Sequence, residues 1–256
     1  LILSSILGMM VMISSNDLIM FYIGLELQSL ALYVLAAFNR DNLLSSESGV
    51  KYFILSALSS GLLLYGCSLI YGFSGSTNFN EISDSLAGDQ YIITFGIVFI
   101  IVGLAFKISA VPFHMWAPDV YQGSPTAVTF FFAIVPKIAA LTVFIRFLYI
   151  PFLEIMDQWQ MIIVFLSIAS MILGAVAAIG QKNLKRLIAY SSISHIGYAI
   201  AGLSTGTNEG IQSSILYITI YAIMNLGFFA CLLMIRKNEK YYENIEDLSG
   251  LSKNHP

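Results

Sequence analysis

Apolar residues in this chain form long continuous runs that are separated by short polar loops. A helix that crosses a bilayer needs about 20 mostly apolar residues, and eight runs reach or approach this length. We predict spans at residues 1–15, 17–38, 50–73, 91–111, 126–149, 160–179, 186–203 and 211–235. Several runs are apolar on every face, unlike the surface helices of soluble proteins. The pattern therefore predicts an all-α membrane protein, a polytopic helix bundle.

Charged residues are too scarce for a soluble protein of this length. Of the 256 residues, 57% are hydrophobic and 11% are charged, whereas a soluble domain carries about 25% charged residues. Cys67 and Cys231 stand alone in apolar runs, without the spacing of a metal, iron–sulfur or disulfide site. The chain begins inside an apolar run and stops in a polar segment, so we expect it to be an internal piece of a longer protein.

The sign of the loop charges alternates from one predicted loop to the next. Basic loops hold Arg40, Lys51, Lys182, Lys185, Arg186, Arg236, Lys237 and Lys240, and acidic loops hold Asp17, Glu81, Asp84, Asp89, Glu154, Asp157 and Glu209. Only Arg146, near a helix end, falls on the acidic side. Basic loops mark the cytoplasmic side, or the matrix side in a mitochondrion. The alternation supports eight consecutive crossings and places the basic loops on the matrix or cytoplasmic side.

A few ionisable side chains remain inside the predicted spans. Glu26, Lys137 and His195 lie near the centres of the spans 17–38, 126–149 and 186–203. A charge at the bilayer centre costs about 2.5–3.5 kcal/mol on insertion scales. Such residues imply a polar path through the protein interior.

Lys107 is placed by a predicted break in its helix. The apolar stretch 91–121 is too long for one straight crossing, and Pro112 interrupts it because proline lacks a backbone donor. A discontinuous helix, broken around residues 108–112, would set Lys107 beside the break. Such breaks occur where protein or a water-filled cavity satisfies the freed backbone groups, as in the ion sites of transporters.

These residues have two interpretations, which are compatible with each other. Glu26 and Lys107 could form a structural ion pair that locks helices together. Alternatively, the residues form a proton relay, because burial favours a neutral lysine and a nearby carboxylate favours a charged one. His195 lies among hydroxyl residues and is either a relay group or a satisfied core residue. The other polar candidates are weaker: His114 at the break, His255 in the polar tail, and Asn225 as a hydrogen-bonding residue between helices.

Four stretches of the sequence resemble the antiporter-like subunits of respiratory complex I. They are residues 103–126 (GLAFKISAVPFHMWAPDVYQGSPT), 24–35 (GLELQSLALYVL), 132–139 (FAIVPKIA) and 181–198 (QKNLKRLIAYSSISHIGY). The sequence of the first stretch is most similar to the branch called NADH dehydrogenase subunit 2, or subunit N in bacteria. The resemblance covers essentially the whole chain.

The resemblance implies roles for four residues and an arrangement of the helices. Glu26, Lys107, Lys137 and His195 would form the proton-translocating axis, with Lys107 on the discontinuous helix. The family core holds two inverted five-helix repeats. Residues 1–149 would supply the first repeat, and residues 150–256 would supply three helices of the second and a polar tail. The second repeat of the family carries a further lysine that this sequence does not include.

The resemblance further implies a non-redox subunit of the proton-translocating NADH:ubiquinone reductase, which couples remote redox chemistry to pumping. No cofactor is expected on this chain, whereas NADH, FMN, iron–sulfur clusters and ubiquinone would act elsewhere in the complex. The expected partners are other membrane-arm subunits, both antiporter-like and small, and membrane lipids, with no nucleic acid. The expected location is a mitochondrial or bacterial inner membrane. The alternatives are a subunit of a multisubunit sodium/proton antiporter and a scaffold without pumping activity; the charges at mid-membrane depth argue against the scaffold.

Overall fold

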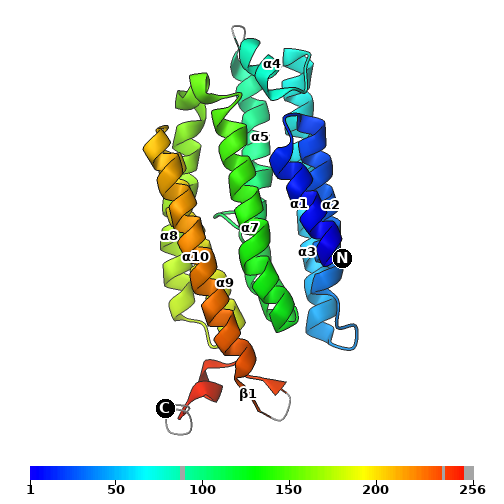
Figure 1. Cartoon of the computed structure of the whole chain (residues 1–256), viewed down its shortest axis with the longest axis vertical. Helices are drawn as coiled ribbons and strands as arrows, with labels where there is room; N and C mark the ends of the chain where they lie inside the picture. Colours follow the sequence, from blue (N-terminus) through cyan, green and yellow to red (C-terminus); the bar gives the residue numbers. More distant parts are fainter. Residues whose placement is uncertain (87–89, 238–239, 251–256) are drawn as a thin grey trace.

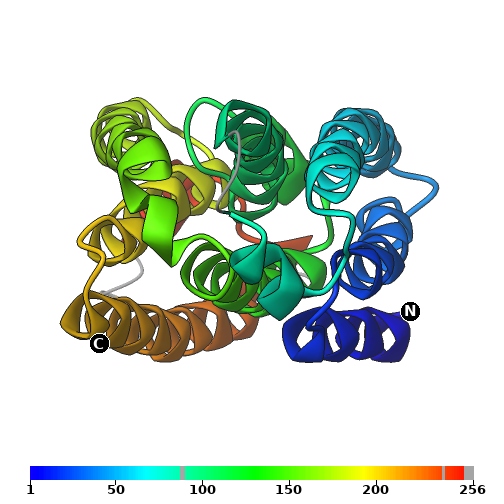
Figure 2. The same cartoon turned by 90° about the horizontal axis from the view of Figure 1, so that it is seen from above.

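The structure, a computed structural model, describes residues 1–86, 90–237 and 240–250. Asp89 and His255 lie outside the described residues. Ten α-helices occur in the described part: α1 (Ile2–Ser14), α2 (Leu18–Ala36), α3 (Leu43–Ser74), α4 (Phe79–Asp84), α5 (Gln90–Ile108), α6 (Trp116–Gly123), α7 (Thr126–Tyr149), α8 (Met156–Ile179), α9 (Leu184–Leu203) and α10 (Asn208–Met234). The long helices run side by side along the long axis of the molecule (Figure 1), and Figure 2 shows them from one end. The chain is therefore an all-α helix bundle, as the sequence predicts.

Each of the eight predicted spans coincides with one of the helices α1, α2, α3, α5, α7, α8, α9 and α10. Five segments are long and apolar enough to cross a membrane by themselves: α2, α3, α7, α10 and the segment Leu153–Ile179 that contains α8. The other three differ for physical reasons. Helix α1 has 13 residues, α5 ends at Ile108 before the break, and α9 begins with basic residues and continues through a run of hydroxyls.

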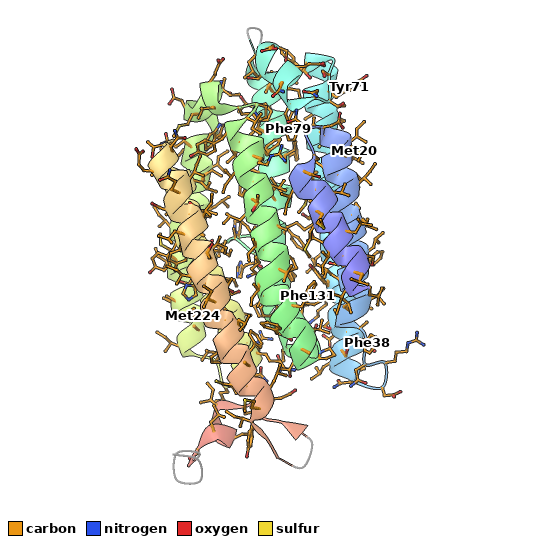
Figure 3. All side chains as sticks on the ribbon, viewed as in Figure 1. Met20, Phe38, Tyr71, Phe79, Phe131 and Met224 are labelled. Atoms are coloured by element: carbon orange, nitrogen blue, oxygen red, sulfur yellow. The ribbon has the colours of Figure 1, made fainter. Side chains whose placement is uncertain are left out.

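Large apolar side chains cover the outside of the bundle. Met20, Tyr71 and Met224 are each about half exposed, at 49%, 53% and 49%, and Figure 3 shows them on outward-facing parts of three different helices. Phe79, in contrast, is 2% exposed. Outward apolar side chains along the length of the helices are what a lipid environment requires.

The loops meet at the two ends of the bundle in the predicted alternation. At the acidic end, the Asp17 carboxylate accepts a hydrogen bond from Thr77, and the Tyr149 hydroxyl donates to the carbonyl of Leu203 at 2.7 Å. Arg146 also lies at this end, where it donates to the carbonyl of Ile13. The loops after α1 and α3, and those after α7 and α9, are thus paired at one end.

Polar side chains begin several of the helices. Asp17, Asn42, Asn78, Asn183 and Thr207 each accept a hydrogen bond from a backbone N–H in the first turn of α2, α3, α4, α9 and α10. These donors have no partner within the helix, and capping them favours helix initiation at these positions. The caps explain where the apolar runs become helical.

Four short features were not predicted from the apolar pattern. Helix α4 lies in a loop at the acidic end, and a hairpin of β1 (Arg236–Lys237) and β2 (Lys240–Tyr241) follows α10 at the opposite end. The polar tail then forms a 3-10 turn, η2 (Ile245–Leu248), and a second such turn, η1 (Leu153–Ile155), precedes α8. None of these elements is long enough to leave a periodic signal.

The break after Lys107 is present. Helix α5 ends at Ile108, Ser109 has a positive φ of 63°, and the peptide bond before Pro112 is cis. The indole N–H of Trp116, in the first turn of α6, donates to the carbonyl of Phe106 at 2.8 Å. The N–H of Val111 donates to the Ser170 hydroxyl on α8, also at 2.8 Å. Neighbouring helices therefore satisfy the backbone groups that the break releases, as a break at membrane depth demands.

Two glycines allow close contact between α3 and α5. A Cβ atom on Gly66 would lie 2.6 Å from the carbonyl oxygen of Gly96 and 2.8 Å from Cγ1 of Ile100. Small residues at such contacts let helix backbones approach within the membrane. The close packing of α3 against α5 holds the helix that carries Lys107.

We expect Gly66→Ala to destabilise the subunit by about 1–3 kcal/mol, the usual cost of overpacking a well-packed interior. Gly61 lies on the same helix with nothing within 4 Å of an added Cβ, so Gly61→Ala is the matched control. Thermal unfolding of the purified complex in detergent measures the difference. Equal unfolding temperatures for the two variants would show that the α3–α5 contact is not tightly packed.

A buried polar axis as the candidate functional site

Lys107 lies in a pocket of hydroxyl groups between α2, α3 and α5. Its side chain is largely buried, at 5% exposure, and the ammonium donates to Ser29 Oγ and to Ser56 Oγ, both at 2.7 Å. Ser56 Oγ also accepts a hydrogen bond from the Tyr33 hydroxyl at 2.5 Å. The Nζ atom is 5.9 Å from the centre of the Tyr33 ring. Three neutral side chains therefore surround this lysine.

Glu26 does not pair with Lys107 in this structure. The ion pairs within the described part of the chain involve other residues, and the buried Oε1 atom of Glu26 has no hydrogen-bond partner. Glu26 and Ser29 lie on the same face of α2 because they are three residues apart. The interpretation as a standing structural ion pair is therefore wrong for this conformation, in which hydroxyls satisfy the lysine.

Lys137 is fully buried in the middle of α7, with 0% exposure. Its ammonium donates to Ser192 Oγ on α9 at 2.6 Å, and its Nζ atom is 5.6 Å from the centre of the Tyr121 ring. Ser192 in turn donates to the carbonyl of Ala189 at 2.9 Å. This lysine, too, is hydrogen-bonded to a neutral hydroxyl.

His195 lies one turn beyond Ser192 on α9 and is half-buried. Its Nδ1 atom is hydrogen-bonded to the Tyr217 hydroxyl on α10 at 2.8 Å, and its ring centre is 5.2 Å from that of Tyr221. Residues three apart on a helix lie on neighbouring positions of one face. The structure thus brings Lys137, Ser192 and His195 together at the junction of α7, α9 and α10.

The sequence prediction named the charged residues and the hydroxyl residues around His195, but it did not foresee that hydroxyls hold the two lysines. Ser29, Tyr33, Ser56 and Ser192 contact the lysines directly or through one another. A usable signal was present on α2, where Glu26, Ser29 and Tyr33 recur at helical spacing.

His114 lies in the α5–α6 connection, and its buried Nδ1 atom has no partner. Asn225 donates to the carbonyl of Tyr221 within its own helix, so the prediction of a bond between helices is wrong.

A separate ionic cluster joins three helices at the basic end. Asp119 on α6 accepts from Lys51 on α3 at 2.9 Å and from Arg186 on α9 at 2.5 Å. Burial of Asp119 favours its neutral form, but the hydrogen bonds from Lys51 and Arg186 outweigh this effect, so the pKa of its carboxyl lies below the usual value of 3.8. The cluster fixes the second part of the broken helix to both of its neighbours. Lys185, predicted as a loop residue, lies in the first turn of α9 and is 4% exposed.

We expect Asp119→Asn to lower the unfolding temperature at pH 7 modestly, since ion pairs as exposed as this one contribute about 0–1 kcal/mol. A carboxyl whose pKa falls on folding stabilises the protein above its unfolded pKa, and this stabilisation is lost as the pH falls through its folded pKa. The difference in unfolding temperature between the variant and the wild type should therefore stay constant as the pH falls from 7 toward 3.8, the usual pKa of an aspartate. It should disappear only below that pH. It should also shrink in high salt. Thermal unfolding measures it, with Asp84→Asn at the exposed acidic end as control; equal losses in the two variants would contradict a role for the cluster.

The described residues contain no group of three or more His, Cys, Asp or Glu side chains that could hold a metal ion. The site has instead basic groups and hydroxyls in the interior of a membrane-spanning bundle. This composition defines a class: a polytopic membrane protein with buried, protonatable side chains between its helices.

Comparisons with known proteins agree with this class. Residues 15–256 match the family model described as NADH:quinone oxidoreductase/Mrp antiporter, TM. The chain is 80% identical over 256 residues to NADH-quinone oxidoreductase subunit N of Pelagibacter ubique, covering 100% of this chain and 54% of that protein. It thus spans about half the length of the curated relatives it matches.

Solved structures share the fold. A chain of respiratory complex I from Thermus thermophilus with bound aureothin superposes with a TM-score of 0.84 at 34% identity, covering 100% of this chain and 55% of that one. A chain of the Mrp complex from Dietzia sp. gives a TM-score of 0.82 at 24% identity, covering 89% and 43%; this likeness shows the fold alone. The protein belongs to the NADH:quinone oxidoreductase/Mrp antiporter transmembrane family and, within it, is similar to subunit N of complex I.

Proposed function

We propose that this chain is part of a proton-translocating membrane-arm subunit of NADH:quinone oxidoreductase. The identity of 80% to a subunit N supports this assignment, as does the fold shared with a chain of complex I. In this proposal the electrons pass elsewhere. NADH, FMN, iron–sulfur clusters and quinone are handled by other subunits, and this chain moves protons.

The observation that carries the proposal is that Lys107, Lys137 and His195, the three bases of the candidate axis, are all hydrogen-bonded to neutral hydroxyls. Lys107 contacts serines, Lys137 contacts Ser192, and His195 contacts Tyr217. A hydroxyl both donates and accepts, so it can satisfy a lysine in its charged and in its neutral form. A carboxylate accepts only and would hold the lysine in its charged form. These bases can therefore gain and lose a proton without leaving a buried group unsatisfied.

The proposed relay starts at Glu26 and Lys107. Redox energy released elsewhere changes the position or charge of Glu26 relative to Lys107, whose proton then moves through Lys137 toward His195. Carrying one charge through the membrane potential involves about 2.3 kcal/mol per 100 mV. Small changes in the environment of each base are sufficient for such a step.

The assembly and orientation follow from the same assignment. The partners would be neighbouring antiporter-like and small subunits of the membrane arm, and lipids would cover the remaining apolar faces. The basic end, with Lys51 and Arg186, would face the cytoplasm of a bacterium. Residues 1–149 would form the first five-helix repeat and residues 150–256 part of an inverted second repeat.

Co-purification tests the assignment to this complex. We expect the tagged protein, extracted in mild detergent from its native membranes, to copurify with subunits that carry flavin and iron–sulfur clusters. Its deletion should abolish NADH-driven quinone reduction without changing sodium tolerance. Copurification with a sodium/proton antiporter, together with sodium-sensitive growth and normal respiration, would support the alternative and overturn the proposal.

A further inference from the structure

The turn of α7 that carries Lys137 contains a proline. Pro136 lies inside the helix, directly before Lys137, and its ring nitrogen has no hydrogen to donate. In a regular α-helix that donor would bond the carbonyl four residues earlier, which here is Phe132. The carbonyl of Phe132 therefore needs a donor from outside α7, because an unpaired backbone acceptor in the interior is costly.

Tyr121 supplies that donor from another helix. Its side chain has 0% exposure, and its hydroxyl donates to the Phe132 carbonyl at 3.3 Å. The face of the same ring lies 5.6 Å from the Lys137 Nζ atom. One tyrosine thus contacts both the open turn and the ammonium that this turn positions.

Tyr121 is itself tied to the broken helix. It lies on α6, where its ring packs edge-on against Trp116 at 6.3 Å between centres. The Trp116 indole donates to the carbonyl of Phe106, the residue before Lys107. A continuous series of contacts therefore runs from the end of α5 through Trp116 and Tyr121 to the turn of Lys137.

We propose that Tyr121 is a positioning residue that completes the α7 turn opened by Pro136 and so holds Lys137 against Ser192. Its place on α6, against Trp116, also links this turn of α7 to the end of α5. The contact that Tyr221 makes with α7 differs from that of Tyr121. The Tyr221 hydroxyl donates to the carbonyl of Ala133 at 3.1 Å, which the N–H of Lys137 can also reach within the helix. Tyr221 therefore adds to a bond that the helix can make, whereas Tyr121 replaces one that Pro136 cannot make.

The relevance of this positioning to pumping rests on the proposed relay, so the test has two readouts. Tyr121→Phe removes only the hydroxyl, and Pro136→Ala restores an N–H that can bond the Phe132 carbonyl. Tyr149→Phe is the matched control, because it removes another tyrosine–carbonyl bond of α7, at the acidic end. All variants, including the double variant, are assayed in the intact complex for amide hydrogen exchange of the peptide spanning residues 132–140 and for NADH-driven proton pumping.

We expect Tyr121→Phe to speed exchange in this turn and to slow pumping about three- to tenfold, the factor for one net hydrogen bond. In the Pro136→Ala background the same substitution should change neither readout. Equal effects in both backgrounds, or unchanged exchange in Tyr121→Phe, would overturn the positioning role. If Pro136→Ala does not assemble, exchange in Tyr121→Phe that is no faster than in Tyr149→Phe overturns it. Failure of the relay appears separately, as normal pumping in Lys137→Met, and leaves the exchange readout valid.

Discussion

Replacing Lys137 with methionine is expected to stop proton pumping while the subunit still assembles. Methionine keeps the length and the apolar part of the side chain and removes the cost of burying an ammonium group. Ser192 loses one contact but still donates to the carbonyl of Ala189. The fold should therefore tolerate the change, whereas the relay loses a protonatable group at its centre. Pumping should fall about a hundredfold or more, the contribution typical of a positioned proton-transfer group.

The measurement is NADH-driven acidification of inverted membrane vesicles, with the amount of assembled complex determined by native gel electrophoresis. Lys182→Met is the matched control, because Lys182 is exposed at the basic end and has no part in the proposed path. The control should pump normally. Vesicles that contain assembled Lys137→Met complex and acidify at the wild-type rate would remove Lys137 from the relay.

Removing both serines around Lys107 is expected to have the second largest effect. The Ser29→Ala, Ser56→Ala double variant takes away the two acceptors of the buried ammonium. A buried charged donor left without a partner costs about 1–3 kcal/mol or more, so the neutral form of Lys107 becomes favoured and pumping is lost. Each single variant keeps one acceptor and should retain part of the activity.

The rate of pumping per assembled complex measures this effect. Ser68→Ala is the control on α3, since its exposed hydroxyl bonds only to the carbonyl of Tyr65 in its own helix. If the double variant lost no more activity than Ser68→Ala, the hydroxyl pocket would not be what holds Lys107 ready for proton transfer.

The fold was largely predictable from the sequence because the membrane restricts the choices. Each long apolar run became a helix, and the predicted span 126–149 agrees with α7 at both ends. Loop charges predicted that successive loops lie at opposite ends of the bundle. The contact between Asp17 and Thr77, from the loops after α1 and α3, agrees with this prediction. Pro112 correctly indicated the break, because proline cannot continue a backbone ladder. These signals depend on the local sequence or on the transfer of apolar side chains from water to lipid. They can therefore be read without knowing how the helices pack.

The detailed site was less predictable because it depends on how the helices are rotated against each other. Serines are common in these spans, and the sequence does not show which of them face Lys107. The packing of α3 on α5 decides which serine binds Lys107. Ser56 accepts its hydrogen bond, whereas the buried hydroxyl of Ser60 has no partner. The same packing leaves Glu26 without a bond to Lys107. The direction of both repeats and the roles of Glu26, Lys107, Lys137 and His195 stay predictions.

The central claim is that Lys107 carries the translocated proton, and proton pumping measured per electron tests it most directly. The Lys107→Met complex, quantified by native gel, is placed in sealed vesicles, and proton uptake and NADH oxidation are recorded on the same sample. The relay predicts a marked drop in protons moved per electron in complex that is assembled and still oxidises NADH. An unchanged ratio of protons to electrons in the assembled Lys107→Met complex would contradict the relay.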